Sequence, residues 1–283
     1  MPFIDTKDLP TNLQEIPDSP KTGLHVLGEA WPDNLKRLCI VGSRKPTDYG
    51  LAVLDKLLSD LSGRPISIIS GLALGIDSAA HRGALKNQLH TVAFPGSGLD
   101  ESVIYPASNR QLAKDIINSG GGLVSEYDPK QKSAQWTFPR RNRLMAGLAD
   151  TVLVVEAGIK SGTLITARLA LDYNRDVLAI PGSVFSPNSA GPHMLLNDGA
   201  KLVQSADDIL EALGIQTSIA KTIDIETLSD DEQTIYRLIR SEPRTKDELI
   251  KLSGLDTTRA LSVITMLELK GITQERLGKV YLN

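Results

Sequence analysis

The chain has 283 residues, 41% of them hydrophobic and 23% charged, and carries a formal net charge of −3 at pH 7. This length suits one large or two ordinary globular domains, and the composition excludes disorder throughout. The sequence has neither the apolar run of a membrane helix nor the start of a secretory signal. Its one cysteine, Cys39, excludes an internal disulfide framework and a cysteine-based zinc site. We therefore expect a cytoplasmic protein with no metal, no cofactor and no membrane partner.

The slightly acidic balance does not by itself indicate a polyanionic partner. A nucleic-acid site would have to come from local clusters of basic residues. The sequence has three such clusters: Arg44 with Lys45, Lys130 with Lys132, and Arg140 with Arg141 and Arg143. A single cluster is more often a solvated surface, whereas several at equivalent points of one fold favour a site.

From about residue 36 to residue 214, short apolar runs alternate with amphipathic segments. The runs typical of strands cover residues 36–42, 65–71, 91–98, 122–127, 151–158 and 176–182. Between them the sequence predicts helices over 51–61, 77–89, 109–118, 142–148 and 163–173. This alternation predicts an α/β fold, a Rossmann-like doubly wound parallel sheet over 36–214 with helices on both faces. We expect residues 1–35 to form an N-terminal extension.

Glycine-rich turns follow most of the predicted strands. They are Gly42-Ser43-Arg44, Gly71, Gly96-Ser97-Gly98, Gly158 with Ser161-Gly162-Thr163, and Pro181-Gly182. In an open parallel sheet the carboxyl ends of the strands line the ligand crevice, and glycines there let backbone N–H groups approach an anion. One such turn would be ordinary loop structure, but five on one edge favour an anion-binding crevice.

Residues 215–227 are expected to be a linker, and residues 228–283 to form a winged-helix domain. Ser229 and Glu232 have the spacing of a capping box at the start of the first of three helices, and a hairpin is predicted around Gly278. The stretch from Leu228 to Asn283 contains nine basic and nine acidic residues. Because phosphate neutralisation dominates non-specific affinity, this domain should bind duplex DNA weakly, and a protein contact is at least as plausible.

Several residues near the predicted crevice have the chemistry of single-strand binding. Arg44 and Lys45 leave the first strand beside a helix start, where a phosphate could meet both cations and backbone N–H groups. Phe138 stands beside Arg141, and an aromatic ring next to a basic track is typical of single-strand binding. Trp136 fits stacking or core packing equally, and Arg143 fits DNA contact or an internal ion pair equally.

Two further motifs have alternative interpretations. Ser161, Gly162 and Thr163 begin a helix whose N–H groups and hydroxyls could hold an anion. Asp77 and His81 lie one helical turn apart, a spacing that could orient an imidazole for acid–base chemistry. The simpler interpretation makes Asp77 a cap or packing group and His81 its satisfied neighbour.

The chain resembles the DprA (Smf) DNA-processing family. The resemblance is carried in order by IVGSRKPTDYG (40–50), SGLALGIDSAAH (70–81), GSGLDESVIYP (96–106), FPRRNRLMAGLAD (138–150), VVEAGIKSGTLITA (154–167) and AIPGS (179–183). It implies a homodimer that binds single-stranded DNA and loads a RecA-type recombinase in natural transformation (competence) and recombination. The DNA-binding arginine of the family falls on Arg44. The residues expected at the DNA are Gly42, Ser43, Arg44, Lys45, Gly71, Phe138, Arg141, Arg143, Ser161, Gly162 and Thr163.

The sequence departs from the family in two places. His193 stands where members commonly have asparagine, and about 35 residues precede the first strand where many members carry a helical N-terminal domain. Activities that depend on that domain are not expected from this chain.

An enzymatic function is not expected. Related Rossmann-like nucleotide hydrolases carry a glutamate in the helix after their glycine loop, whereas this chain has Thr166 and Ala167 there. Gly42-Ser43-Arg44 also lacks the spacing of a dinucleotide-binding loop. The alternative hypothesis is a nucleotide-sensing or nucleotide-hydrolysing module whose output is the winged helix. A duplex-specific regulator is a third hypothesis, and the neutral recognition helix speaks against it.

Overall fold

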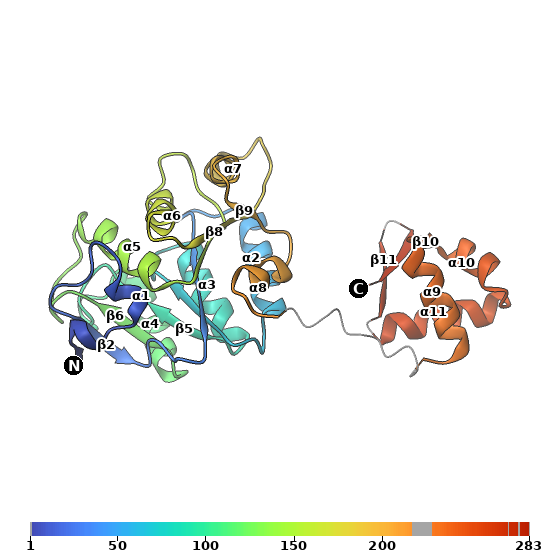
Figure 1. The fold of residues 1–283 in the computed structure, drawn as a ribbon, viewed down its shortest axis with the longest axis horizontal. Coiled ribbons are helices and arrows are strands. Elements are labelled where there is room, and N and C mark those ends of the chain that lie inside the picture. The colour runs from blue at the N-terminus through green and yellow to red at the C-terminus, as the bar shows by residue number, and fades with distance from the viewer. Residues whose placement is uncertain (1, 217–227, 271, 277, 283) are drawn as a thin grey trace. The chain divides into compact units, whose positions relative to one another are not determined.

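The computed structural model describes residues 2–216, 228–270, 272–276 and 278–282, and the chain divides into two compact units (Figure 1). The first unit ends at Ile215 and the second begins at Gln216. Most of the segment expected to be a linker, residues 217–227, lies outside the described residues. None of the helices in the described ranges combines the length and apolarity needed to span a bilayer.

A sheet of nine described strands forms the centre of the first unit. The strands are β1 (Phe3–Ile4), β2 (Leu24–Gly28), β3 (Lys36–Val41), β4 (Ile66–Ser70), β5 (His90–Ala93), β6 (Gly122–Ser125), β7 (Thr151–Val154), β8 (Asp176–Ala179) and β9 (Lys201–Leu202). Their order is β1-β2-β6-β5-β4-β3-β7-β8-β9, and every pair from β6 to β9 is parallel.

Helices cover both faces of this sheet. One face carries α2 (Asp48–Asp60), α3 (Ile76–Lys86), α4 (Arg110–Asn118) and α8 (Ala206–Ala212). The other carries α1 (Thr11–Gln14), α5 (Thr137–Leu148), α6 (Thr163–Asp172) and α7 (Ala190–Asn197). Strands β3, β4 and β7 are buried on both faces, which is why their sequences are continuous apolar runs. The expected Rossmann-like doubly wound fold is confirmed.

The boundaries differ from the sequence-based expectation in three ways. Strands β1 and β2 lie within residues 1–35, expected to be an extension, and β2 pairs antiparallel with β6, so this segment completes the sheet. The strands also end earlier than expected; β5, for example, stops at Ala93. Helix α5 begins at Thr137, five residues before the expected start. Pro139 is compatible with this start because it falls in the first turn, where its missing N–H would have no helical partner.

The chain order reverses at β3. From β3 the chain proceeds outward through β4, β5 and β6, and it then returns to place β7 on the other side of β3. The loops that leave the carboxyl ends of β3 and β7 therefore diverge towards opposite faces of the sheet. Such a switch point is where open α/β sheets form their ligand crevice.

The second unit has the winged-helix architecture. It contains α9 (Asp230–Ser241), β10 (Arg244–Thr245), α10 (Lys246–Ser253), α11 (Thr257–Leu269), β11 (Thr273–Arg276) and β12 (Lys279–Leu282). The strands form an antiparallel sheet in the order β10-β12-β11. This unit has a hydrophobic core of its own, which includes Ile235, Leu249, Ile264 and Val280. The capping box at Ser229 forms as expected, with the Ser229 backbone N–H donating to Glu232 Oε2 at 3.0 Å.

Candidate anion-binding crevice

A cavity of about 790 Å³ lies at the switch point between β3 and β7. Eight of the eleven residues expected at the DNA line it: Gly42, Ser43 and Arg44 after β3, Phe138 and Arg141 on α5, and Ser161, Gly162 and Thr163 before and at the start of α6. We call this cavity the crevice. Residues up to 121 positions apart in sequence therefore meet here, as in the hydrogen bond from Thr163 Oγ1 to the Gly42 carbonyl, 3.1 Å long.

The other three expected residues, Lys45, Gly71 and Arg143, do not line the crevice. Lys45 is exposed next to Arg44. Gly71 lies against Arg141, whose guanidinium atoms are 2.3–2.6 Å from the place a Cβ at Gly71 would occupy, so only glycine fits there. It also lines a smaller adjoining pocket with Arg44, Tyr105 and Phe138.

Arg44 is the exposed cation at the mouth of the crevice. Its Cζ lies 5.5 Å from the centroid of the Phe138 ring, within the range of a cation–π contact. The ring of Phe138 rests against Gly96, where a Cβ would approach it to 2.5 Å, and lies 5.8 Å from the ring of Tyr105. The crevice mouth thus combines a guanidinium with two aromatic rings.

The loop that carries Arg44 is held by the backbone at the start of α3, which packs closely against it. The Ile76 N–H donates to the Ser43 carbonyl at 3.0 Å, and Lys45 N–H donates to Ser43 Oγ at 3.1 Å. Gly75 has φ +79°, and a Cβ there would lie 2.2 Å from the Ser43 oxygen. Glycine is required at this position by both conformation and space. Arg44 is therefore presented by an ordered loop.

Arg141 forms the floor of the crevice, with only 5% of its surface exposed. Its Nη1 donates to the carbonyls of Gly71 and Phe94, and its Nε donates to Asn142 Oδ1 at 3.0 Å. Asp77, also buried, is its electrostatic counterpart. Burial raises the pKa of Asp77 above its usual range, and the charge of Arg141 opposes that rise most strongly. The Arg141 guanidinium thus spends most of its hydrogen-bonding capacity on groups of the protein itself.

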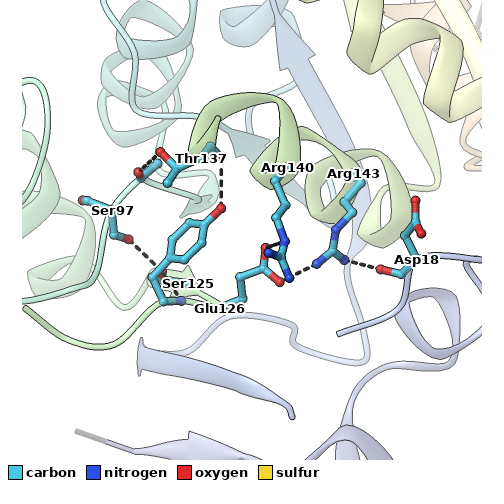
Figure 2. A network of polar contacts seen from close by, with 9 residues as sticks. Asp18, Ser97, Ser125, Glu126, Thr137, Arg140 and Arg143 are labelled. Carbon is cyan, nitrogen blue, oxygen red and sulfur yellow. Dashed lines mark hydrogen bonds and ion pairs between the residues drawn. The ribbon is translucent and has the colours of Figure 1, made fainter. Parts of the chain in front are cut away.

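The other two arginines of the Phe-Pro-Arg-Arg-Asn-Arg segment converge on one carboxylate. Arg140 and Arg143 both form ion pairs with Glu126, and Arg143 also donates to the Asp18 carbonyl, as Figure 2 shows. Arg143 and Glu126 are both buried, with side chains 8% and 7% exposed. Of the two interpretations of Arg143, the structure supports the internal ion pair.

The start of α6 supplies the opposite wall of the crevice. Ser161 Oγ donates to Thr163 Oγ1 at 3.0 Å and accepts from the Thr163 N–H at 3.2 Å, so the two hydroxyls order the turn. Lys160, exposed immediately before them, also lines the crevice. The helix has no acidic residue in its first turn, so its dipole leaves this wall positive.

The acid–base interpretation of Asp77 and His81 is not supported. His81 is fully buried, its Nδ1 lies 2.7 Å from Thr91 Oγ1, and burial lowers its pKa to about 3. It is neutral at physiological pH and does not line the crevice. Thr166 lines the crevice. The described residues contain no cluster of His, Cys, Asp or Glu suited to a metal ion.

Family models match both units of the chain. Residues 1–214 match the model described as DNA recombination-mediator protein A, and residues 220–275 match the DprA winged helix domain. The chain belongs to the DprA family. It is 41% identical over 209 residues to Protein Smf of Escherichia coli, covering 74% of this chain and 55% of that protein. It is 39% identical over 215 residues to DNA processing protein DprA of Bacillus subtilis, covering 74% and 70%.

Solved DprA structures resemble this one. The X-ray structure of DprA from Streptococcus pneumoniae is 40% identical and superposes with a TM-score of 0.69, covering 74% of this chain and 73% of that chain. DprA from Helicobacter pylori, described in terms of its unique single-stranded DNA binding mode, is 29% identical with a TM-score of 0.66, covering 75% and 94%. The chain spans only 55% of the E. coli relative, just over half its length.

Sequence reasoning missed two residues of the crevice in this DprA family member. Tyr105 lines it, is 51% exposed and contacts Phe138, although it lies 33 residues before it in sequence. Lys160 lines it next to Ser161. Both had a signal in the sequence. Tyr105 is an aromatic residue directly before a proline in a loop, and Lys160 is a basic residue directly before the Ser-Gly-Thr turn.

Proposed function

We propose that this chain binds single-stranded DNA in the crevice and acts as a recombination mediator that loads a RecA-type recombinase onto the strand. The observation that carries the proposal is the placement of the Arg44 guanidinium 5.5 Å from the Phe138 ring, at the open mouth of a cavity whose far wall is the positive start of α6. Phosphates would meet Arg44, Lys45 and Lys160, and a base would stack beside Phe138.

The charges at the crevice support a polyanionic ligand. Among the described residues, Arg44, Lys45 and Lys160 form no ion pair with a carboxylate. Their charge is therefore available to phosphates, whereas Arg143 is held by Glu126 and we exclude it from the direct contacts. Because stacking on Phe138 needs an unpaired base, the geometry favours a single strand over a duplex.

The likeness to the H. pylori protein, described as binding single-stranded DNA, supports the same ligand here. The match to the DNA recombination-mediator model supports the proposed loading role, in the cytoplasm during natural transformation or related recombination. We further propose that the chain forms a homodimer through its Rossmann-like unit. The loop after β8 supports this, because Val184 and Phe185 are 79% and 94% exposed.

The proposed role is not enzymatic, since the one carboxylate among the described residues that line the crevice, Asp77, is buried and faces the charge of Arg141. A mononucleotide ligand remains the alternative, favoured by a cavity volume within the range of small-molecule sites, roughly 300–1,000 Å³. A strand occupies several cations at once and a mononucleotide only one or two. Competition by excess mononucleotide therefore separates the two ligands.

The test is fluorescence anisotropy of a labelled oligothymidylate and a matched duplex, titrated with the wild-type chain and with Arg44→Ala. Removing one charge-assisted contact should weaken single-strand binding by about 10- to 100-fold. The log–log salt slope should become shallower by about 0.7 if Arg44 neutralises one phosphate. Lys56→Ala is the matched control, because it removes an exposed cation from α2, away from the crevice.

Equal affinity for the strand and the duplex would contradict the proposal. So would an Arg44→Ala variant that binds as tightly as Lys56→Ala, since the crevice would then not be the binding site. Full displacement of the strand by a mononucleotide would instead favour the nucleotide-sensing alternative.

A further inference from the structure

Trp136 is an exposed aromatic residue at the edge of the crevice. It occupies the position just before the first residue of α5, and its neighbours Gln135 and Phe138 both line the crevice. The sequence left core packing and stacking equally open for this residue. With 55% of its surface exposed, Trp136 is not a core residue.

The exposed indole is held in place by its surroundings. It meets the buried Tyr127 edge-to-face, with ring centroids 5.7 Å apart and planes at 86°. Tyr127 Oη donates to the Thr137 carbonyl at 3.2 Å, and Thr137 Oγ1 donates to the Gly96 carbonyl at 2.6 Å; both bonds are drawn in Figure 2. An aromatic platform that is already ordered loses little conformational entropy when a ligand stacks on it.

The surroundings of Trp136 carry positive charge. Arg140 and Arg143 share the single carboxylate of Glu126, so this group of three retains one net positive charge, and the side chain of Arg140 is 56% exposed. Lys132 is exposed in the loop that leads to Trp136. A protein segment that is merely apolar would gain nothing from these cations, whereas a nucleic-acid backbone would.

We infer that Trp136 is a second stacking platform, which takes a base of the single strand where the strand leaves the crevice on the Gln135 side. The inference rests on the proposed function, because it extends the same strand by one contact. Its occupant is a nucleobase, whose π-face stacks on an indole whatever the base, while the phosphates on either side meet Arg140 and Lys132.

The composition of the chain provides a direct probe. Trp31 and Trp136 are its two tryptophans, and Trp31 packs partly buried against the core of the first unit. In the full-length Trp31→Phe variant, Trp136 is the sole source of tryptophan emission. Titration with oligothymidylate should quench that emission strongly, with the same midpoint as the anisotropy of the labelled strand. In the Trp136→Phe variant, the emission of Trp31 should stay nearly constant.

Affinity provides the second arm of the test. Loss of one stacked base should weaken strand binding by about 5- to 100-fold in Trp136→Ala, and Trp136→Phe should retain more affinity than Trp136→Leu, which keeps bulk without a ring. The salt slope should stay unchanged in all three variants, because no charge is removed, and this separates them from Arg44→Ala.

The outcomes distinguish this inference from the proposed function. If the strand binds and Arg44→Ala weakens binding, but Trp136 emission stays constant and Trp136→Ala binds normally, the inference is wrong and the crevice proposal stands. If no variant or wild type binds the strand, both are wrong. If Trp136→Leu binds as well as Trp136→Phe, the residue acts through bulk and the stacking role is overturned.

Discussion

The crevice and the winged helix use their cations in opposite ways. At the crevice mouth, Arg44 lies over an aromatic ring and Lys160 stands beside a helix start, and neither forms an ion pair among the described residues. Arg259 lies on α11, the helix that would read DNA in a winged-helix protein, and pairs with Asp231 at 2.5 Å; Lys270, the C-cap of α11, pairs with Glu232 at 2.6 Å. The acidic start of α9 thus neutralises both cations.

The outer surface of α11 reinforces this contrast. Leu261, Met266 and Leu269 are exposed, Leu269 to 78%, where a DNA-reading helix would present polar and basic groups. In both units, the position of the nearest carboxylate decides what each cation can bind. A winged-helix fold alone is therefore no evidence of duplex binding in this chain.

The largest expected effect is a loss of stability when Arg141, the buried arginine of the crevice floor, is replaced. Arg141→Met should destabilise the first unit by about 3–5 kcal/mol, because it leaves buried Asp77 without its counter-charge and two carbonyls without a donor. Urea unfolding followed by tryptophan emission reports on this unit alone, since Trp31 and Trp136 both belong to it.

The matched change in the second unit is Arg259→Met. The Arg259 side chain is 63% exposed, so its ion pair with Asp231 should contribute at most about 1 kcal/mol. Hydrogen exchange of the α11 amides measures that loss. A similar loss from both substitutions would mean that the Arg141 guanidinium is far better solvated than its contacts indicate.

An intermediate effect is expected when Arg259 and Lys270 lose the carboxylates with which they pair. The double variant Asp231→Asn, Glu232→Gln keeps the shapes of both side chains and removes the partners of Arg259 and Lys270. On an Arg44→Ala background, its affinity for duplex DNA should rise, with a salt slope steeper by about 0.9 for each cation that reaches a phosphate. Anisotropy with a labelled duplex measures both quantities.

The control for this release is Asp230→Asn, Asp247→Asn, which removes the same charge from the same domain. Neither residue pairs with a cation among the described contacts. If both double variants gain duplex affinity equally, net charge and not pairing limits the winged helix.

The smallest effect is a pH dependence that differs in sign between the units. The hydrogen bond from Lys270 holds the pKa of Glu232 below its usual value of 4.5, so its stabilisation is complete above that pH and is lost as pH falls through the folded-state pKa. The pKa of Asp77 is raised, so acid relieves the cost of its buried charge. Calorimetry of wild type and Glu232→Gln should show their stability difference shrinking below pH 4.5; a constant difference would contradict the assignment.

The strand pattern and the family motifs were enough to predict most of the fold. Six apolar runs between residues 36 and 182 became β3 to β8, because strands buried on both faces need apolar residues at every position. Strands β1 and β2 escaped prediction, since an edge pair only two and five residues long leaves little periodicity. The early start of α5 was hidden by Pro139, which breaks a helix pattern in the interior but is tolerated in the first turn.

The sequence indicated where in the fold the crevice lies more accurately than it indicated what each residue there contacts. Glycine turns at strand ends located the crevice, because the carboxyl ends of parallel strands share one edge. The roles within the Arg140–Arg143 segment could not be assigned from sequence. Consecutive residues of a helix point about 100° apart, so neighbours in sequence face different surroundings.

The sequence alone established the chemistry that this protein has available: glycines that admit a backbone or an anion, arginines in clusters, and aromatic residues beside them. Which cation remains free, and which aromatic residue faces solvent, depended on contacts between distant segments. Glu126 holds two arginines, the carbonyls of Gly71 and Phe94 hold a third, and Trp136 contacts Tyr127 at its edge but stays exposed. Charge pairing and burial act over a few ångströms in space, and separation along the chain does not reveal them.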